Sequence, residues 1–244
     1  MKKAILLSAL LVSSMLLSAC SPIVQGVTAV SSVLTVANDR RSAGTILDDK
    51  TLYIRLNNII KDDVMLDGTH VNFMIYDGVV LMTGEAPSVE LKLRLEKRIK
   101  SKSSQIARLV NEVAVMPTSS YISRTKDSLI ALQVEALFQN QEVFHPAHVR
   151  VLTERKTVYL MGAVTKREAE HATNQAAKAK NVTKVLRLFN YLSKRPAEEI
   201  ERDKLKQAEA EKRAALEAKK SELQDAQAAL QDAQAALQEQ IDTL

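Results

Sequence analysis

The stretch that decides the fold is VNFMIYDGVVLMTG, residues 71–84. Every second residue from Val71 to Ile75 is apolar, a turn follows at Asp77-Gly78, and a second apolar run leads to Gly84. Period-two alternation closed by a turn predicts a strand, a turn and a second strand. Because only glycine enters positive φ freely, we expect Gly84 to stand where the second strand gives way to a helix.

The same pattern returns without a gap at residues 149–162. Val80 falls on Val158 and Gly84 falls on Gly162. A register that is kept over this length indicates two tandem copies of one small domain. A chain of 244 residues can hold one or two domains, and the repeat decides for two.

Each copy begins with a predicted helix. In the first copy, apolar residues recur at helical spacing at Leu52, Leu56, Ile59 and Ile60, and in the second at Ile130, Val134, Leu137 and Phe138. Asp48-Asp49 and Asp127 are expected at the helix entrances, because negative charge suits the N-terminal end of the helix dipole. Asp62-Asp63 is likewise interpreted as charge at a helix end.

The hairpins are followed by a charged helix at about 88–102 and at about 165–180, and then by a closing strand near 109–116 and 184–192. Each copy therefore has the order α-β-β-α-β, in an α+β fold where two helices cover one face of a three-stranded sheet. The predicted domains span residues 46–117 and 122–193.

The first residues are typical of a bacterial export signal. Lys2 and Lys3 precede an apolar stretch from Ala4 to Leu17, too short for a stable membrane span. It ends on Leu17-Ser18-Ala19-Cys20, which resembles a lipobox. We expect residues 1–19 to be removed, Cys20 to carry a covalent lipid, and residues 20–45 to form a tether. The alternative is an ordinary cleaved signal with a chance cysteine.

The element order, the glycine of the second strand and the tandem copy resemble the BON domain. Further similarity to outer-membrane lipoproteins with two BON domains lies in Cys20, Arg41-Ser42-Ala43-Gly44-Thr45, Asp48-Asp49 and the run Val158–Thr165. The resemblance implies a lipid-anchored protein of the outer membrane that faces the periplasm. It also implies a role in envelope integrity, anionic phospholipid binding and an association with the division site. It supplies no catalytic residues, and the last fifty residues have no counterpart in it.

The two copies differ in charge. Residues 46–117 hold ten basic and ten acidic residues, whereas residues 122–193 hold eleven basic and six acidic residues, a net charge of +5. Anionic lipid attracts such a domain by about 1 kcal/mol for each basic residue close to the surface. The alternatives are a nucleic-acid ligand and a solvated basic surface without a ligand. A protein outside the cytoplasm rarely meets nucleic acid, so we expect no nucleic-acid ligand.

The first helix of the second copy has an apolar outer side. If Ile130, Val134 and Phe138 face inward, steps of about 100° per residue place Leu129, Leu132 and Ala136 outward. Arg124 and Lys126 flank this stripe, as in an interfacial helix that lies among lipid headgroups. The equivalent set in the first copy, Thr51, Ile54 and Asn58, is more polar. Alternatively, the stripe packs against the other domain or another subunit.

The sequence offers little for catalysis. His145 and His148 flank Pro146, but neither an acidic nor a thiol partner is evident nearby. His70 repeats His148, which favours a structural role at the strand entrance. Asp48-Asp49 and Asp62-Asp63 are not interpreted as an acid/base pair, because neither has a histidine or a nucleophile in a matching context. No phosphate-binding glycine loop is present. We expect no enzyme, no metal and no cofactor apart from the lipid on Cys20.

Residues 197–244 form a different kind of segment. They contain neither glycine nor proline, and leucine recurs every seventh residue at Leu216, Leu223, Leu230, Leu237 and Leu244. This heptad pattern predicts a coiled-coil tail, with a single solvated helix as the alternative.

Together, the lipobox, the resemblance to BON domains, the charge of the second domain and its apolar helix face predict a non-catalytic lipoprotein that binds anionic phospholipid through its second domain. The competing function is an interaction scaffold that binds envelope proteins or copies of itself through the Leu129/Leu132 face and the tail.

Overall fold

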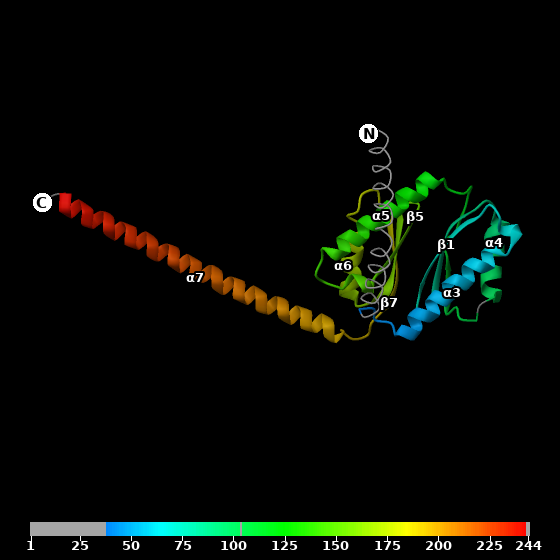
Figure 1. Ribbon diagram of the computed structural model, residues 1–244, viewed down its shortest axis with the longest axis horizontal. Coiled ribbons are helices and arrows are strands. Elements are labelled where there is room, and N and C mark those ends of the chain that lie inside the picture. The colour runs from blue at the N-terminus through cyan, green and yellow to red at the C-terminus, as the bar shows by residue number, and fades with distance from the viewer. Residues whose placement is uncertain (1–37, 103, 243–244) are drawn as a thin grey trace, which may run out of the picture. The chain divides into compact units, whose positions relative to one another are not determined.

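The computed structural model describes residues 38–102 and 104–242, in two compact units that divide between Leu192 and Ser193. The first unit contains both copies of the repeat (Figure 1). The first copy consists of α3 (Ala43–Lys61), the 3₁₀ helix η1 (Val64–Leu66), β1 (His70–Tyr76), β2 (Val79–Ala86), α4 (Val89–Lys102), β3 (Arg108–Asn111) and β4 (Ala114–Val115). The second consists of α5 (Tyr121–Gln139), η2 (Pro146–His148), β5 (Arg150–Glu154), β6 (Thr157–Val164), α6 (Lys166–Ala176) and β7 (Lys184–Tyr191). The predicted α+β class with tandem αββαβ copies is confirmed.

The second strand of each copy lies at the centre of its sheet. β1 runs antiparallel to β2, and β3 and β4 both pair with β2 in parallel. In the second copy, β5 is antiparallel and β7 parallel to β6, with β7 paired from Lys184 to Tyr191. The closing strand of the first copy is interrupted, because Asn111 Oδ1 accepts a hydrogen bond from the backbone N–H of Val113 (3.1 Å).

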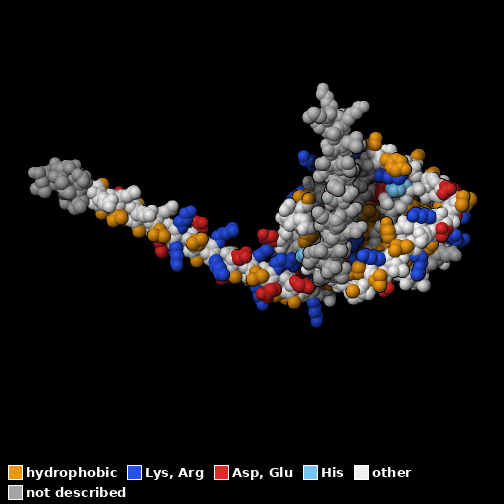
Figure 2. Space-filling model, viewed as in Figure 1, with side chains coloured by type: hydrophobic (Ala, Val, Ile, Leu, Met, Phe, Trp, Pro, Cys, Tyr) orange, Lys and Arg blue, Asp and Glu red, His pale blue; other side chains and the backbone are white. Residues whose placement is uncertain are grey.

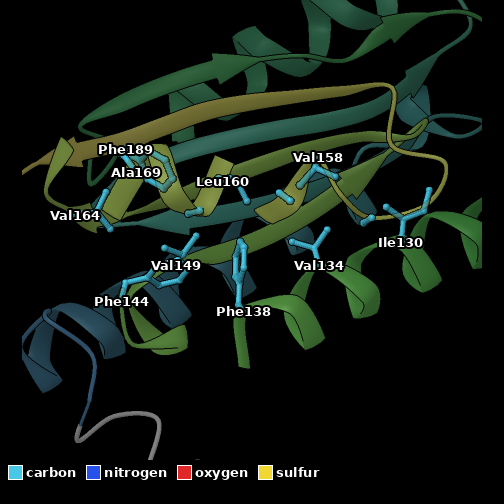
Figure 3. Close-up of a cluster of buried hydrophobic side chains, with 13 residues drawn as sticks. Ile130, Val134, Phe138, Phe144, Val149, Val158, Leu160, Val164, Ala169 and Phe189 are labelled. Carbon is cyan, nitrogen blue, oxygen red and sulfur yellow. The ribbon is translucent and has the colours of Figure 1, made fainter. Parts of the chain in front are cut away.

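The helices cover one face of each sheet through apolar contacts. Figure 3 shows α5 presenting Ile130, Val134 and Phe138 to Val158 and Leu160 of β6. In the first copy, Leu52 and Leu56 of α3 and Leu95 and Ile99 of α4 make the equivalent core with β1 and β2. The residues that helical spacing predicted to face inward therefore lie in the two hydrophobic cores.

The other face of each sheet is covered by the opposite sheet. Met74, Tyr76, Val79 and Leu81 form one buried cluster with Tyr159 and Met161. The two sheets are consequently the inner layers of the unit, with α3 and α4 outside one and α5 and α6 outside the other (Figure 1). Burial in this interface raises the pKa of Tyr159 to about 12. The sequence interpretation covered only the face that packs against the helices.

Two arginines ahead of α3 connect the two domains. Arg40 donates to both carboxylate oxygens of Glu168 (2.8 and 2.9 Å) and to the carbonyl oxygen of Ala163 (2.8 Å), all in the second domain. Arg41 pairs with Asp49 (2.7 Å) and lies 4.2 Å from the ring centre of Tyr76, both in the first domain. Part of the predicted tether is therefore a fixed link between the domains.

The predicted helix entrances are wrong. Ser42 caps α3 by accepting a hydrogen bond from the N–H of Thr45, and Ser120 caps α5 by accepting one from Ser123. Each helix thus begins well before the aspartates that were expected to mark its start, and α3 begins inside the predicted tether. The hydroxyl oxygens of Ser42 and Ser120 accept hydrogen bonds from N–H groups of the first turn, so these serines mark the starts of the helices in place of the aspartates.

The aspartates instead hold the turns of the hairpins. Asp49 accepts hydrogen bonds from the backbone N–H groups of Asp77 (2.8 Å) and Gly78 (3.0 Å). Asp127 does the same for Arg155 and Lys156, both at 2.9 Å. This pair of bonds is repeated in both copies, and it fixes each first helix to the end of its hairpin.

Gly84 and Gly162 lie inside their strands, so the prediction that they end the strands is wrong. Gly84 has a φ of +117°, and a Cβ there would lie 1.9 Å from the carbonyl oxygen of His70. A Cβ on Gly162 would lie 2.0 Å from the carbonyl oxygen of His148. The glycines are required by the close approach of the neighbouring strand, and β2 and β6 continue to Ala86 and Val164.

The end of α6 differs from the sequence interpretation, whereas the placement of Asp62 and Asp63 at helix ends is confirmed. α6 ends at Ala176, earlier than predicted, and begins with a capping box between Thr165 and Glu168. Asp62 is the C-terminal cap of α3, whereas Asp63 caps η1 and forms ion pairs with Arg94 (2.8 Å) and Arg98 (3.2 Å) of α4.

The second unit consists mainly of α7 (Ala197–Asp242), a single helix of 46 residues. At a rise of about 1.5 Å per residue its length is on the order of 70 Å. Leu216, Leu223 and Leu230 are all exposed along it. The predicted helix is confirmed, and its pairing as a coiled coil stays a prediction.

Candidate functional site

The outer side of α5 carries the candidate binding surface. Its inner side is held by the core, so the residues on the opposite side remain exposed: Leu129 by 54% and Leu132 by 59% of their surface. Ala136 is exposed one turn further on. The three predicted apolar residues therefore lie on one exposed stripe.

The stripe extends to the start of the helix, which the sequence interpretation missed. Tyr121 is 84% and Ile122 is 70% exposed. Ile122 precedes Leu129 by seven residues, or two helical turns, so the spacing alone could have identified it. Hydrophobic side chains reach the surface near this end of α5 (Figure 2). We call Tyr121, Ile122, Leu129, Leu132 and Ala136 the α5 apolar face.

The two predicted basic residues lie on different sides of this face. Steps of about 100° per residue place Lys126 on one flank and Arg124 on the other. Lys126 is exposed, whereas Arg124 is half-buried and donates to the carbonyl oxygen of Ser119 (2.8 Å) and to its hydroxyl (3.2 Å). The guanidinium of Arg124 also lies 5.3 Å from the ring centre of Tyr121. Lys126 is therefore the more available of the two for an anionic ligand.

The outer side of α3 is less polar than the sequence interpretation suggested. Leu47 and Ile54 are exposed to about the same extent as the α5 leucines. The difference lies in their surroundings, because Asp48 occupies the flank where α5 has Lys126. The equivalents of Tyr121, Ile122 and Leu129 are Ala43, Gly44 and Thr51. The apolar surface of α3 is thus smaller and lies beside a negative charge.

A second cluster of functional groups lies between the domains. His70 starts β1, Glu85 is its direct partner on β2, and Glu154 ends β5 of the other domain. One candidate ligand atom from each of the three lies within 4.8 Å of the others. Asn72 Nδ2 donates to Glu154 Oε2 (2.9 Å). No spacing in the sequence links His70 to Glu154, so only the packing of the two sheets could reveal this cluster.

Burial sets the charges in this cluster. Burial and the nearby Arg124 lower the pKa of His70, against the opposing effect of Glu85. Burial raises the pKa of Glu154, and the charges of Glu85 and Asp127 raise it further, although the hydrogen bond from Asn72 and the charge of Arg155 oppose this. These shifts favour the neutral form of His70 and the neutral form of Glu154 more than in the free side chains.

His145 and His148, the histidine pair considered in the sequence, lie in a different environment from His70. His145 caps η2, where its Nδ1 accepts from the N–H of Ala147 (3.2 Å), and His148 is buried with its ring centre 5.5 Å from that of His145. Within the described ranges, the candidate metal-binding triad does not include either residue.

The predicted membrane anchor consists of the lipid on Cys20, the first residue that remains once residues 1–19 are removed. Cys20 and residues 1–19 lie outside the described residues. None of the helices within 38–102 and 104–242 has the length and apolar character needed to cross a membrane.

The fold defines a class of protein, one with two αββαβ modules whose sheets pack face to face. The BON domain model matches both modules, at residues 48–117 and 126–191. The chain therefore belongs to the BON domain family, and the resemblance noted in the sequence is confirmed.

Two curated relatives are similar over most of their length. The outer membrane lipoprotein DolP of Haemophilus influenzae is 32% identical over 187 residues, which is 76% of this chain and 95% of that protein. The 21 kDa hemolysin of Actinobacillus pleuropneumoniae is 30% identical over 156 residues, 63% of this chain and 79% of that protein. Among solved structures, the C-terminal domain of CdsD from Chlamydia trachomatis aligns at 13% identity with a TM-score of 0.24 over 59% of this chain and 67% of that one, a likeness too low to support an inference.

Proposed function

We propose that the protein is a lipid-anchored lipoprotein of the outer membrane that faces the periplasm and binds anionic phospholipid through α5 of its second BON domain. The observation that carries this proposal is the α5 apolar face, an exposed and uncharged surface on a domain with a net charge of +5. The similarity to an outer membrane lipoprotein supports the location. The role is a non-catalytic one in envelope integrity; an association with the division site stays a prediction from the family resemblance.

Charge and apolar burial act together in this proposal. Basic residues near an anionic surface contribute about 1 kcal/mol each, but salt screens that attraction. An apolar side chain fully removed from water contributes about 1.5–3 kcal/mol, and less if insertion is shallow. We therefore expect binding that requires anionic lipid and weakens only partly as salt rises.

Vesicle co-sedimentation tests the proposal with residues 21–244, which lack the predicted anchor. Leu129→Glu combined with Leu132→Glu should abolish binding to anionic vesicles while the circular dichroism spectrum stays native, because both side chains point away from the core. The matched control is Thr51→Glu with Ile54→Glu at the equivalent exposed positions of α3, and it should bind much like the wild type. Equal binding by the Leu129/Leu132 variant would contradict the proposed membrane face.

The scaffold function has its own supporting observation. Leu216, Leu223 and Leu230 are exposed at heptad spacing on α7, an arrangement that favours pairing with another helix. We propose self-association through residues 197–244 as a second activity of the chain. Deletion of these residues should lower the number of chains per particle measured by sedimentation equilibrium, and an unchanged number would contradict self-association.

Lipidation of Cys20 is a separate proposal that rests on the lipobox. Cys20→Ala should leave an unprocessed precursor without acyl chains. If this variant still ran as the mature protein and fractionated with the outer membrane, the anchor assignment would be wrong.

A further inference from the structure

The cluster of His70, Glu85 and Glu154 has a buried acceptor that no hydrogen bond satisfies. The side chain of Glu85 is fully buried, and its Oε1 accepts no hydrogen bond within the described structure. Its Oε2 accepts from the backbone N–H (3.3 Å) and the hydroxyl (3.1 Å) of Ser119. A buried carboxylate oxygen without such a partner carries a desolvation cost that a cation would offset.

The charges around this oxygen leave room for a cation. Glu85, Glu154 and Asp127 are the acidic side chains around it, and Arg155 and Arg124 are the basic ones. Arg155 Nη1 is 3.7 Å from Glu85 Oε1, beyond hydrogen-bond distance, and donates to the carbonyl oxygen of Gly84 (2.7 Å) instead. Arg124 is hydrogen-bonded to Ser119. The two arginines thus offset part of the negative charge, but they donate their hydrogen bonds to Gly84 and Ser119 and not to Glu85.

We propose that His70, Glu85 and Glu154 bind a divalent transition-metal ion, for which zinc is the reference. One imidazole nitrogen and two carboxylate oxygens are ligands that zinc accepts, and three protein ligands leave a fourth position for water. The candidate ligand atoms lie within 4.8 Å of one another, so modest side-chain rotations bring them to a common centre. The hydrogen bond from Asn72 to Glu154 orients one carboxylate.

A recess beside the cluster gives an ion and water access to it. The recess has a volume of about 290 Å³, and both His70 and Glu154 line it. Asn72, Arg124 and Asp127 also contribute to its wall. An ion in this recess would therefore lie beside one proposed ligand from each domain, His70 of the first and Glu154 of the second.

The ion would join the two domains. His70 and Glu85 belong to the first domain and Glu154 to the second, so a bound ion would add a direct link across the sheet interface. Its role would be structural, and it is independent of the proposed lipid binding.

Zinc titration of the full chain in detergent tests this proposal. Isothermal titration calorimetry should detect one zinc ion per chain, and zinc should raise the melting temperature because it binds the folded state. Glu85→Gln and Glu154→Gln keep the side-chain volume, and each should weaken zinc binding by more than about tenfold. Loss of a residue that only hydrogen-bonds to a metal ligand already lowers metal affinity by about tenfold or more, and these two variants remove a ligand itself. His145→Ala is the matched control and should bind zinc as the wild type does.

Cobalt provides an independent readout. Co²⁺ in place of zinc should give the visible absorption bands of a four-coordinate site, and His70→Ala should remove them. Absence of zinc binding, binding that is unchanged in both glutamine variants, or loss of binding in His145→Ala would each overturn the proposal.

Discussion

The two BON domains share an internal frame and differ in their outer surfaces. Both use an aspartate of the first helix to hold the hairpin turn, and both need a glycine where the neighbouring strand passes closely. On the outside, the α5 apolar face lies beside Lys126, whereas α3 exposes Leu47 and Ile54 beside Asp48. The repeat thus keeps what fixes the fold, and the helix surfaces have diverged.

The packing of the sheets explains why this divergence lies on the helices. Each sheet has one face against its own helices and the other against the opposite sheet. The helices α3 and α5 therefore offer the surfaces on which the two domains can bind different ligands. Under the proposed function, the larger apolar face of α5 and the change from Asp48 to Lys126 at its flank would both favour α5 over α3 at an anionic membrane.

The shared glycines should show the largest effect. Gly84→Ala and Gly162→Ala each place a Cβ about 2 Å from a backbone carbonyl oxygen. Each should destabilise the protein by more than about 4 kcal/mol, which is exceptional for a single substitution. Urea unfolding followed by circular dichroism measures the loss, and a cost below about 1 kcal/mol for either one would contradict the close approach of the strands.

Loss of the link between the domains should have the next largest effect. Arg40→Gln leaves Glu168 buried without its arginine, which should cost about 3 kcal/mol at neutral pH. Burial alone would raise the pKa of Glu168, but the bonds from Arg40 and the Thr165 N–H bring it below its ordinary value of 4.5.

The sign of the pH dependence follows from this lowered pKa. The stabilisation from the ion pair is complete above the unfolded-state value of 4.5 and is lost as pH falls through the lower folded-state pKa. The difference in unfolding free energy between wild type and Arg40→Gln should therefore shrink as pH falls from about 4.5 toward the lower folded-state pKa of Glu168, and should stay small below it. A difference that stays constant from pH 7 down to acid unfolding would argue against this pair.

The turn aspartates should have an intermediate effect. Asp127→Ala removes the acceptor of two backbone N–H groups and should cost about 2 kcal/mol. Asp49→Ala should cost more, because Arg41 also loses a partner. Chemical unfolding of the two variants gives this order, and the reverse order would show that the two turns are held differently.

The turns themselves differ between the copies, which gives the smallest effect. The first copy has Gly78 at a φ of 71°, whereas the second has Lys156 at 59°, a conformation that costs a residue with a Cβ about 1 kcal/mol. Lys156→Gly should therefore raise the unfolding free energy slightly, by up to about 1 kcal/mol. Urea unfolding measures this change, and a loss of stability would indicate that Lys156 makes a contribution beyond its backbone.

Sequence patterns predicted the repeat, the order of the elements and the inward faces of both first helices. These features depend on local periodicity, which a sequence records directly. The entrances of the helices were wrong because Ser42 and Ser120 are the caps and the aspartates lie within the first helices. The role of Asp49 depends on a hairpin that is distant in sequence. The cluster of His70 and Glu154 depends on how the two sheets meet, and no single copy of the repeat contains that information.

The central claim is that α5, and not α3, enters the membrane surface. The chain contains no tryptophan, so Leu132→Trp and Ile54→Trp each introduce a single fluorophore at equivalent exposed positions. With vesicles of anionic phospholipid, the tryptophan emission of the Leu132→Trp variant should shift to shorter wavelength, while that of the α3 variant should stay as in buffer. An unshifted spectrum for Leu132→Trp, or equal shifts in both variants, would contradict the claim.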